Sequence, residues 1–307
     1  MRLEVPLALA GERLDRAVAT LCGLSRRQVA DAVGAGGVVV DGVVATRRSA
    51  PVAGGELLEV TAPRPEDDVP GPDPSVPVAV VHADDHLVVV DKPAGLVVHP
   101  GAGRRRGSLV EGLLARYPEI AGVGERSRPG IVHRLDAGTS GLLVVARTPQ
   151  AHAALVAQLA ARTVDRRYRA LVWGHPGAER GLVDAPIGRS ATHRTRMAVV
   201  AHGREARTHY EVLARFARPR PLALLACRLD TGRTHQIRVH LAAIGHPVVG
   251  DDRYGGRRPA VALERPFLHA EGLALDHPAT GQPCRWASPL PPELEAALAE
   301  LEPAGPP

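Results

Sequence analysis

A proline-rich stretch divides this chain more firmly than any other feature of its sequence. Residues 61–77 read TAPRPEDDVPGPDPSVP and contain six prolines, several acidic residues and almost no large apolar side chain. Proline fixes φ and removes a backbone donor, so this composition favours an extended, semi-rigid linker. We therefore predict a small domain over residues 1–62, a linker over residues 63–77 and a large domain over residues 78–307. Two domains suit a chain of 307 residues, since domains average roughly 150 residues.

Two short helices are predicted in the small domain. Apolar residues recur at helical spacing over residues 14–21, and Ser25 with Gln28 three residues on forms a capping-box pattern that opens a second helix. Arg26 and Arg27 fall in the first turn of that helix, where the helix dipole disfavours cations. Local stability therefore does not explain these two arginines, whereas contact with a phosphate would.

A β-hairpin is predicted after the two helices. Residues 38–40 and 43–44 are all valine, and Asp41-Gly42 separates them. An Asp-Gly pair supplies the positive φ angles that a tight type I′ turn demands.

The large domain mixes strand and helix signals without a regular alternation of the two. Apolar or β-branched runs of strand length occupy residues 87–90, 141–146 and 168–173, and helical patterns occupy residues 108–115 and 150–162. Because these segments do not follow a repeated strand–helix–strand order, we predict an α+β domain rather than a doubly wound parallel sheet.

Composition limits the classes that remain. The cysteines Cys22, Cys227 and Cys284 are odd in number and far apart, which argues against a disulfide framework and against a CxxC metal site. No apolar run approaches the roughly 18 residues of a membrane span, and Glu4 interrupts the opening segment where a signal peptide would be apolar. The net charge of +5 favours a polyanionic partner. We therefore expect a soluble, cytoplasmic protein that binds no membrane.

Two dense polar segments are the candidate sites of chemistry, since HExxH, G-x-S-x-G and Walker motifs are absent from the sequence. The first, IVHRLDAGTSG over residues 131–141, places Asp136 on a turn directly before an apolar strand. The second, DTGRTHQIRVHL over residues 230–241, has apolar residues four apart, which predicts the start of a helix that carries Arg238. A carboxylate that stays ionised in a partly dry pocket needs a nearby cation, so we pair Asp136 with Arg238.

The first polar segment resembles the signature of the RluA-type pseudouridine synthases, whose aspartate is catalytic. Other segments match that family in the expected order, namely KPAGLVVHP (92–100), RYRALV (167–172), TGRTHQIRVHLAAIGHPVVGD (231–251), RYG (253–255), LHA (268–270) and HPATG (277–281). The small domain resembles the S4 RNA-binding domain over residues 13–45; otherwise it is a structural appendage. The resemblance implies an α+β catalytic domain with a mixed, mainly antiparallel central sheet, preceded by a small S4-like α/β domain.

The resemblance also implies roles for particular residues. Asp136 would act on the ribose of a uridine, either by attacking C1′ or by removing a proton at C2′. Tyr168 would pack against the target base, and Arg238 would pair with the aspartate. Arg134 would fill the space that a flipped uridine leaves, or else form a structural salt bridge. We expect loop-shaping and hydrogen-bonding roles for His133, Thr139, Ser140, Gln236 and His240.

The partner that the resemblance implies is RNA, with large-subunit ribosomal RNA favoured and transfer RNA as the alternative. Arg26, Arg27 and the run of Arg104, Arg105 and Arg106 are candidate RNA contacts, although the run could be a solvated loop. No cofactor is expected, because forming pseudouridine involves no net redox change, and no metal is expected, because no histidine pair has a carboxylate or cysteine at ligand spacing. We expect a monomer. Two rival functions are a catalytically silent RNA-binding protein and a hydrolytic nucleoside glycosidase, which would release free uracil.

Overall fold

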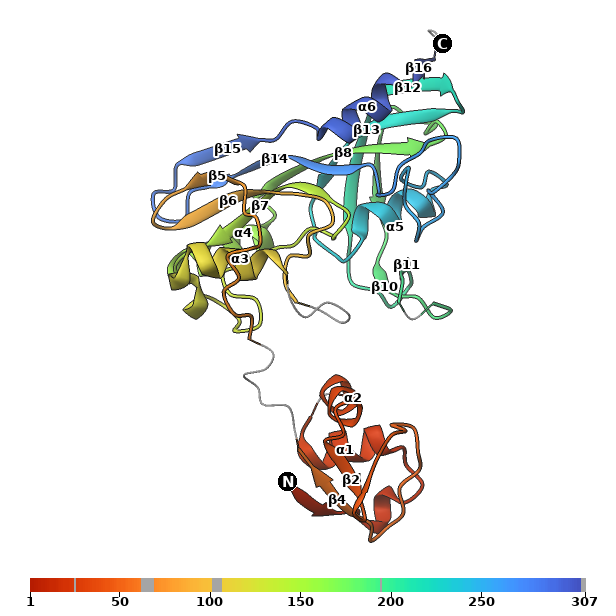
Figure 1. Cartoon of the computed structure of the whole chain (residues 1–307). Coiled ribbons are helices and arrows are strands. Elements are labelled where there is room, and N and C mark those ends of the chain that lie inside the picture. Colours follow the sequence, from red (N-terminus) through yellow and green to blue (C-terminus); the bar gives the residue numbers. More distant parts are fainter. Residues whose placement is uncertain (25, 62–68, 101–106, 194, 305–307) are drawn as a thin grey trace. The chain divides into compact units, whose positions relative to one another are not determined.

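The chain folds into two compact units, residues 1–69 and residues 70–307 (Figure 1). The computed structural model describes the chain apart from residues 25, 62–68, 101–106, 194 and 305–307, and at residues 26 and 27 it describes the backbone alone. The division falls inside the proline-rich segment. Residues 70–77 of the predicted linker belong to the second unit, because the amide of Asp73 donates to the carbonyl of Glu111 at 2.9 Å and Val76 is buried.

The first unit is a small antiparallel sheet with two helices. Its strands lie in the order β1-β4-β2-β3. The elements are β1 (Arg2–Glu4), a 3-10 turn (Leu7–Leu9), α1 (Leu14–Cys22), α2 (Arg26–Gly34), β2 (Val38–Val40), β3 (Val43–Val44) and β4 (Leu57–Val60). Val18, Val29 and Leu58 are fully buried and join both helices to the sheet in one apolar core.

The helices and the hairpin predicted for this unit are confirmed. The strands β2 and β3 pair antiparallel across the Asp41-Gly42 turn. Asp41 has a φ of 46° and Gly42 a φ of 80°, the positive values that such a turn requires. The predicted cap of α2 at Ser25 lies outside the described residues.

A large mixed sheet forms the second unit. Its order is β16-β12-β13-β8-β14-β7-β6-β5, with β15 paired to β14 and β9 paired to β12. Its strands are β5 (Val80–Ala83), β6 (Leu87–Lys92), β7 (Ser140–Ala146), β8 (Asp165–Trp173), β9 (Arg180–Asp184), β12 (Arg207–Arg218), β13 (Leu222–Leu229), β14 (Leu268–Asp276), β15 (Pro283–Ala287) and β16 (Glu302–Pro303). Every described strand pair in it is antiparallel except β7 with β14, which confirms the mixed, mainly antiparallel sheet of an α+β domain.

Helices and a short hairpin complete the unit. They are α3 (Leu109–Arg116), a 3-10 helix (Pro118–Gly122), α4 (Pro149–Ala161), α5 (Gln236–Ala243) and α6 (Pro292–Ala299), with β10 (Ile187–Arg189) and β11 (Met197–Val199) as the hairpin. The capping box predicted at the start of α3 is present, since Glu111 accepts hydrogen bonds from the amide and the hydroxyl of Ser108 at 2.7 and 2.8 Å.

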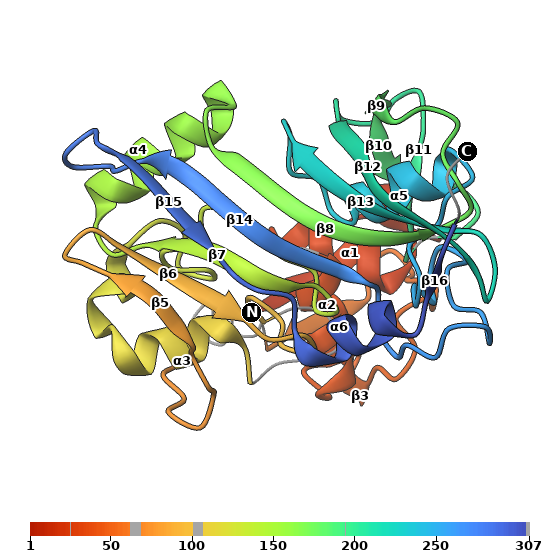
Figure 2. The ribbon, with the colours of Figure 1, turned by 90° about the horizontal axis from the view of Figure 1, so that it is seen from above.

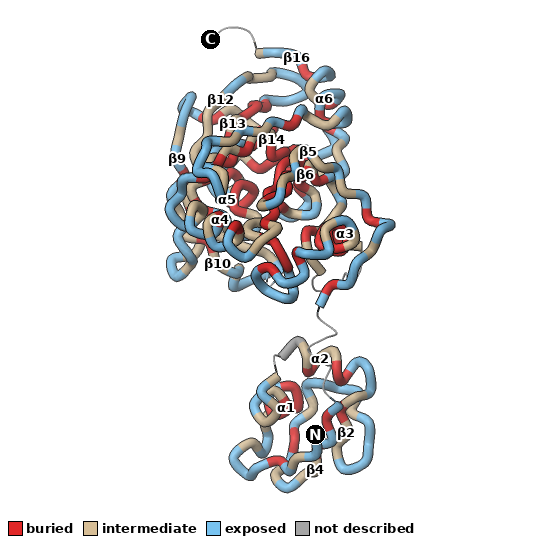
Figure 3. Tube along the Cα trace, turned by 90° about the vertical axis from the view of Figure 1, so that its left-hand side faces the viewer, coloured by how far each residue is buried: buried red, intermediate tan, exposed pale blue. Residues whose placement is uncertain are grey.

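The strands β6 and β7 are buried on both faces. Leu143 and Val145 of β7 pack into one apolar core with α3, whereas Leu142 and Val144 pack into a second core with Leu155 of α4. The two helices therefore cover opposite faces of the same strands, as Figure 2 shows. Burial on both faces explains why these strands are continuous apolar runs rather than runs that alternate apolar and polar residues. Figure 3 shows that the buried positions of this unit are concentrated in the large sheet.

Pairing in this sheet brings the sequence motifs together. The start of β7, just after the turn at residue 136, lies beside β14, with Ser140 opposite His269. On its other edge β14 pairs with β8, which carries Tyr168, and β8 pairs with β13, which leads into α5. Segments far apart in the chain thus meet around one end of these strands.

Candidate active site

A cavity of about 670 Å³ lies in the second unit at that end of the strands. The two polar segments predicted from the sequence both line it, and so do β8 and Leu268. Asp136, Tyr168 and Arg238, the three residues predicted to be catalytic, are all part of its wall.

Asp136 is held on a turn that leads into β7. The amide of Thr139 donates to the carbonyl of Asp136 at 3.0 Å, and the amide of Gly95 donates to the carbonyl of Ala137 at 2.7 Å. These bonds fix the backbone of the turn, and the Asp136 side chain is 14% exposed at the cavity. The carboxylate is therefore shielded by protein but reachable from the cavity.

The predicted pairing of Asp136 with Arg238 is present. Nη1 of Arg238 donates to Oδ2 of Asp136 at 3.1 Å. Arg238 belongs to the first turn of α5, where its side chain is 7% exposed. A rigid helix thus delivers the guanidinium to the carboxylate.

A second carboxylate, Asp251, orients this arginine. The Nε and Nη2 groups of Arg238 donate to the two oxygens of Asp251 at 2.6 and 2.8 Å, and Asp251 is fully buried. Burial opposes the positive charge of Arg238, but the hydrogen bonds and charge of Asp251, and then the charge of Asp136, outweigh it and raise the pKa of the guanidinium. The ring of Tyr254 lies under the same guanidinium, with its centroid 5.2 Å from Cζ of Arg238.

Tyr168 lies on β8 and is almost completely buried at the cavity wall. Burial, with a smaller contribution from the charge of Asp136, raises the pKa of its phenol, while the charge of Arg166 opposes that shift. The phenol therefore keeps its proton at neutral pH and presents an aromatic ring with a polar tip.

The residues expected to shape loops do make such contacts. Nε2 of His133 accepts from the amide of Val144 at 3.1 Å, and burial followed by the charge of Arg166 lowers the pKa of His133 to about 3. Gln236 joins the loop before α5 to β12, because it accepts from the hydroxyl of Thr231 at 2.7 Å and donates to the carbonyl of residue 207 at 2.9 Å.

Two further buried contacts complete these loop-shaping networks. The hydroxyl of Ser140 lies 3.0 Å from Nδ1 of His269, and Nδ1 of His240 lies 2.9 Å from the hydroxyl of Thr208. Thr139 is buried, and its amide closes the turn at Asp136.

Of the predicted RNA contacts, the structure describes one side chain. Arg134 is exposed at the cavity and lies 3.3 Å from Nε2 of His99, and it makes no ion pair with the described residues. A structural salt bridge is therefore not its role in the described part of the chain. Arg26 and Arg27 open α2, but their side chains are not described, and Arg104, Arg105 and Arg106 lie outside the described residues.

Several groups at or beside the site had no assigned role in the sequence prediction, and three of them lie around Asp136, Arg238 or the turn that holds Asp136. The first is Asp251, described above. The second is His235, whose Nδ1 lies 2.8 Å from the hydroxyl of Tyr254 and whose Nε2 lies 4.0 Å from Oδ1 of Asp136. The third is Lys92, the chain's only lysine.

Lys92 is completely buried behind the turn that holds Asp136. Its amine donates to the carbonyls of Pro93 and Leu96, both at 2.9 Å, and of Ala137 at 3.3 Å. Burial lowers the pKa of this amine to about 7, against the opposing charge of Asp136. Lys92 therefore ties the KPAG segment to the turn, and its position in that motif was the only sequence signal for it.

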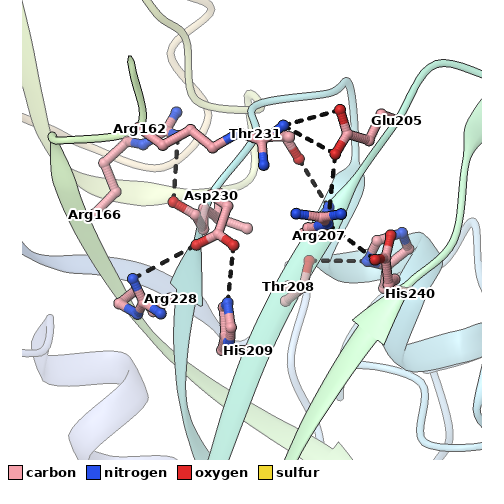
Figure 4. A network of polar contacts seen from close by, with 12 residues as sticks. Arg162, Arg166, Glu205, Arg207, Thr208, His209, Arg228, Asp230, Thr231 and His240 are labelled. Carbon is pink, nitrogen blue, oxygen red and sulfur yellow. Dashed lines mark hydrogen bonds and ion pairs between the residues drawn. The ribbon is translucent and has the colours of Figure 1, made fainter. Parts of the chain in front are cut away.

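Arginines dominate the rim of the cavity. Seven arginines and three acidic residues line it, so the wall carries an excess of positive charge. One of those acids, Asp230, is already engaged by His209 at 2.9 Å and by Arg228 at 3.5 Å (Figure 4).

No group of three or more histidine, cysteine or carboxylate side chains that could hold a metal occurs among the described residues. No described helix is both long enough and apolar enough to cross a membrane.

Comparison with known proteins places the chain in a known class of enzyme. A model of RNA pseudouridylate synthases matches residues 86–243, and a model of the S4 domain matches residues 12–58. The chain belongs to the RNA pseudouridylate synthase family, which makes it an isomerase, and it carries an S4 domain at its N-terminal end. Both family resemblances predicted from the motifs are confirmed.

Individual relatives agree over nearly the whole chain. It is 48% identical to ribosomal large subunit pseudouridine synthase D of Nitrosomonas europaea, over 97% of this chain and 87% of the relative. It is 46% identical to the protein of the same name from Pseudomonas aeruginosa, over 94% of this chain and 91% of the relative. Among solved structures, human RNA pseudouridylate synthase domain containing 1 superposes with a TM-score of 0.58 at 30% identity, over 76% of this chain and 91% of the other.

Proposed function

We propose that this protein isomerises specific uridines to pseudouridine in large-subunit ribosomal RNA, with Asp136 as the catalytic group. The observation that carries the proposal is the Asp136 carboxylate, which faces a cavity and is bound by a guanidinium that a second, buried carboxylate holds in place. The names of the relatives from Nitrosomonas and Pseudomonas supply the class of RNA.

The chemistry requires one bond to break and another to form at the same sugar carbon. The N1–C1′ bond of the uridine breaks, the uracil turns, and C5 bonds to C1′; C5 then loses its proton and N1 gains one. No electrons are gained or lost overall, so the proposed reaction needs no redox cofactor.

An ionised Asp136 can start this reaction in two ways. The carboxylate can attack C1′ and form a covalent intermediate, or it can remove the proton from C2′. The two routes differ in a measurable quantity, because only the second breaks a C2′–H bond. A deuterium at C2′ would slow the second route and leave the first nearly unchanged.

Other residues have supporting roles in this proposal. Tyr168 packs against the target base, and Arg238 keeps the carboxylate oriented. Arg134, exposed at the cavity, occupies the space that the flipped uridine leaves in the RNA. Arg26, Arg27 and the arginines at 104–106 contact the RNA backbone, which would make binding sensitive to salt.

Replacement of Asp136 tests the proposal directly. Asp136→Asn should reduce pseudouridine formation by at least about 10³-fold, because the amide can neither attack nor accept the proton. Circular dichroism and RNA binding should stay close to those of the wild type. The control is Asp85→Asn, which removes an exposed carboxylate outside the cavity wall and should leave turnover unchanged.

The substrate is identified by mapping. Pseudouridines in ribosomal and transfer RNA are compared between cells with and without the gene, and the purified protein is then given the RNA that changes. Full turnover by Asp136→Asn would refute the catalytic role. Release of free uracil would point to a hydrolase, and binding without any change in the RNA would point to a silent binding protein.

A further inference from the structure

Arg166 is a buried arginine of the cavity wall that the proposed mechanism leaves unused. It lies on β8, two residues before Tyr168, so the two side chains are on the same face of the strand and about 6.6 Å apart along it. Arg166 is 6% exposed, and it lines the same cavity as Asp136.

The hydrogen bonds of this guanidinium are incomplete. An arginine has five N–H donors. Nη2 of Arg166 donates to the carbonyl of Leu229 at 3.3 Å, whereas Nε is buried and has no hydrogen-bond partner among the residues that the structure describes. No carboxylate within the described part of the chain forms an ion pair with Arg166.

Neighbouring arginines on the same strand show what is missing. Arg167 and Arg169 lie on the opposite face of β8, and each has a carboxylate partner: Asp165 at 2.8 Å for the first and Glu271 at 2.5 Å for the second. Arg166 is more buried than either, and burying an unpaired charge is unfavourable. A structural role alone therefore leaves its position unexplained, while an anionic ligand in the cavity would supply the missing acceptor.

The surroundings of Arg166 favour a phosphate as that ligand. Nη1 of Arg166 lies 2.9 Å from the position that a Cβ on residue 232 would take. Because residue 232 is glycine and has no Cβ, the guanidinium can reach the turn before α5. Arg162 and Arg233 line the same cavity, and Figure 4 shows Arg162 and Arg166 near Asp230, a carboxylate that His209 and Arg228 already occupy. A guanidinium with free N–H groups in a positively charged wall matches the oxygens of a phosphate.

We infer that Arg166 binds a backbone phosphate of the RNA next to the target uridine, inside the catalytic cavity. The inference rests on the proposed function and adds a positioning residue to it. Since Arg166 and Tyr168 are about one nucleotide length apart, the phosphate would be one that flanks the uridine held against Tyr168. Arg166 would thereby fix the sugar of that uridine relative to Asp136.

This role predicts opposite effects on activity and on stability. Arg166→Met keeps a long apolar side chain but removes the charge, so it should lower kcat/KM by about 10- to 100-fold, the usual effect of losing a hydrogen bond to a charged group. The same variant should have an unchanged or higher Tm, because the unpaired buried charge is gone. The control, Arg167→Met, removes the same charge from the other face of the strand and should leave kcat/KM unchanged.

The decisive experiment changes the phosphates one at a time. A short RNA that carries the mapped uridine is made with a single neutral methylphosphonate at each linkage around that uridine, and kcat/KM is measured for the wild type, Arg166→Met and Arg167→Met. We expect one linkage at which the methylphosphonate lowers kcat/KM of the wild type and of Arg167→Met. At that linkage the kcat/KM of Arg166→Met, which is already low on the unmodified RNA, should fall almost no further.

Two outcomes would overturn the inference. In the first, the losses from Arg166→Met and from every methylphosphonate simply multiply, which would mean that Arg166 binds no phosphate and acts elsewhere, for example on a uracil carbonyl. In the second, Arg166→Met lowers Tm and leaves kcat/KM intact, which would make the residue structural. The unmodified RNA distinguishes a failure of this inference from a failure of the proposed function. A wild-type protein that does not isomerise the unmodified RNA contradicts the proposed function. A wild-type protein that isomerises it leaves only the role of Arg166 to be decided.

Discussion

Two carboxylates hold Arg238 unequally, and the difference decides what each can do. Asp251 accepts two N–H groups and is fully buried, whereas Asp136 accepts one and remains open to the cavity. Backbone amides of Arg253 and Tyr254 also donate to Asp251, at 2.9 and 3.2 Å. Asp251 is therefore committed to holding the guanidinium, and Asp136 keeps an oxygen for the substrate.

Replacing Asp251 should reveal this division of roles. Asp251→Asn should lower kcat by about 10²-fold with a much smaller change in KM, because the arginine that orients Asp136 would lose its fixed position. The free energy of unfolding should fall by about 3 to 5 kcal/mol, as expected when one partner of a buried ion pair is removed. Steady-state kinetics and urea denaturation check these values. Asp252→Asn, an exposed neighbour, is the control, and a rise in KM at constant kcat would contradict the positioning role.

At the residue scale the sequence identified two partners only where both lay in a recognisable polar motif. Asp136 and Arg238 could be paired from the sequence, because one lies in the signature and the other on the helix predicted within the second motif. Asp251, at the end of that second motif, gave no sign of its role, since its bidentate contact depends on a loop that folds back onto α5. Arg166 was equally hidden, because β8 begins Asp-Arg-Arg-Tyr-Arg and places arginines on both faces of the strand, so the sequence does not show which face is buried.

At the scale of elements, local patterns predicted more than pairing did. The α1, α3 and α4 helices and the Asp-Gly hairpin follow from spacing and turn chemistry within a few residues. The long strands β12, β13 and β14 had no comparable prediction, and their register depends on partners distant in the chain, such as Leu225 opposite Ala170. Sheet order therefore became visible only in the structure.

One glycine of the signature shows how such pairing constrains the site. Gly141 is the second residue of β7 and has a φ of +110°, and a Cβ at this position would collide with the backbone of Ala270 in the parallel partner β14. Gly141→Ala should lower the free energy of unfolding by at least about 1 kcal/mol, through backbone strain and the clash. Activity should also fall, because the displaced strand carries the Asp136 turn with it.

Thermal denaturation and pseudouridine assays measure both effects of Gly141→Ala. The control is Gly122→Ala, because that glycine has open space around it and no positive φ. A Gly141→Ala protein with wild-type Tm and turnover would show that β7 and β14 can separate without moving the site.

At the scale of the whole molecule the two units differ in how acid should affect them. Every one of the 14 histidines follows residue 70, so the first unit has none. In the second unit His240 and His269 are fully buried, and burial lowers the pKa of both imidazoles. Each is bound as a neutral ring, His240 to a threonine hydroxyl and a backbone carbonyl, and His269 to Ser140 and the carbonyl of Ser288.

The second unit should therefore lose stability in mild acid before the first unit does. Below the unfolded pKa of about 6.5 the unfolded chain binds protons that the folded chain excludes, so stability falls as pH decreases, by up to about 1.4 kcal/mol per pH unit for each such histidine. Trp173 and Trp286 both belong to the second unit, so their fluorescence reports on it alone. Between about pH 7.5 and about pH 5.5 the urea midpoint measured by this fluorescence should decrease, and His240→Gln should reduce the slope. Hydrogen exchange of the α1 amides should show little change over the same range, because no histidine of that unit titrates. A parallel loss of protection in α1 would mean that the two units unfold as one.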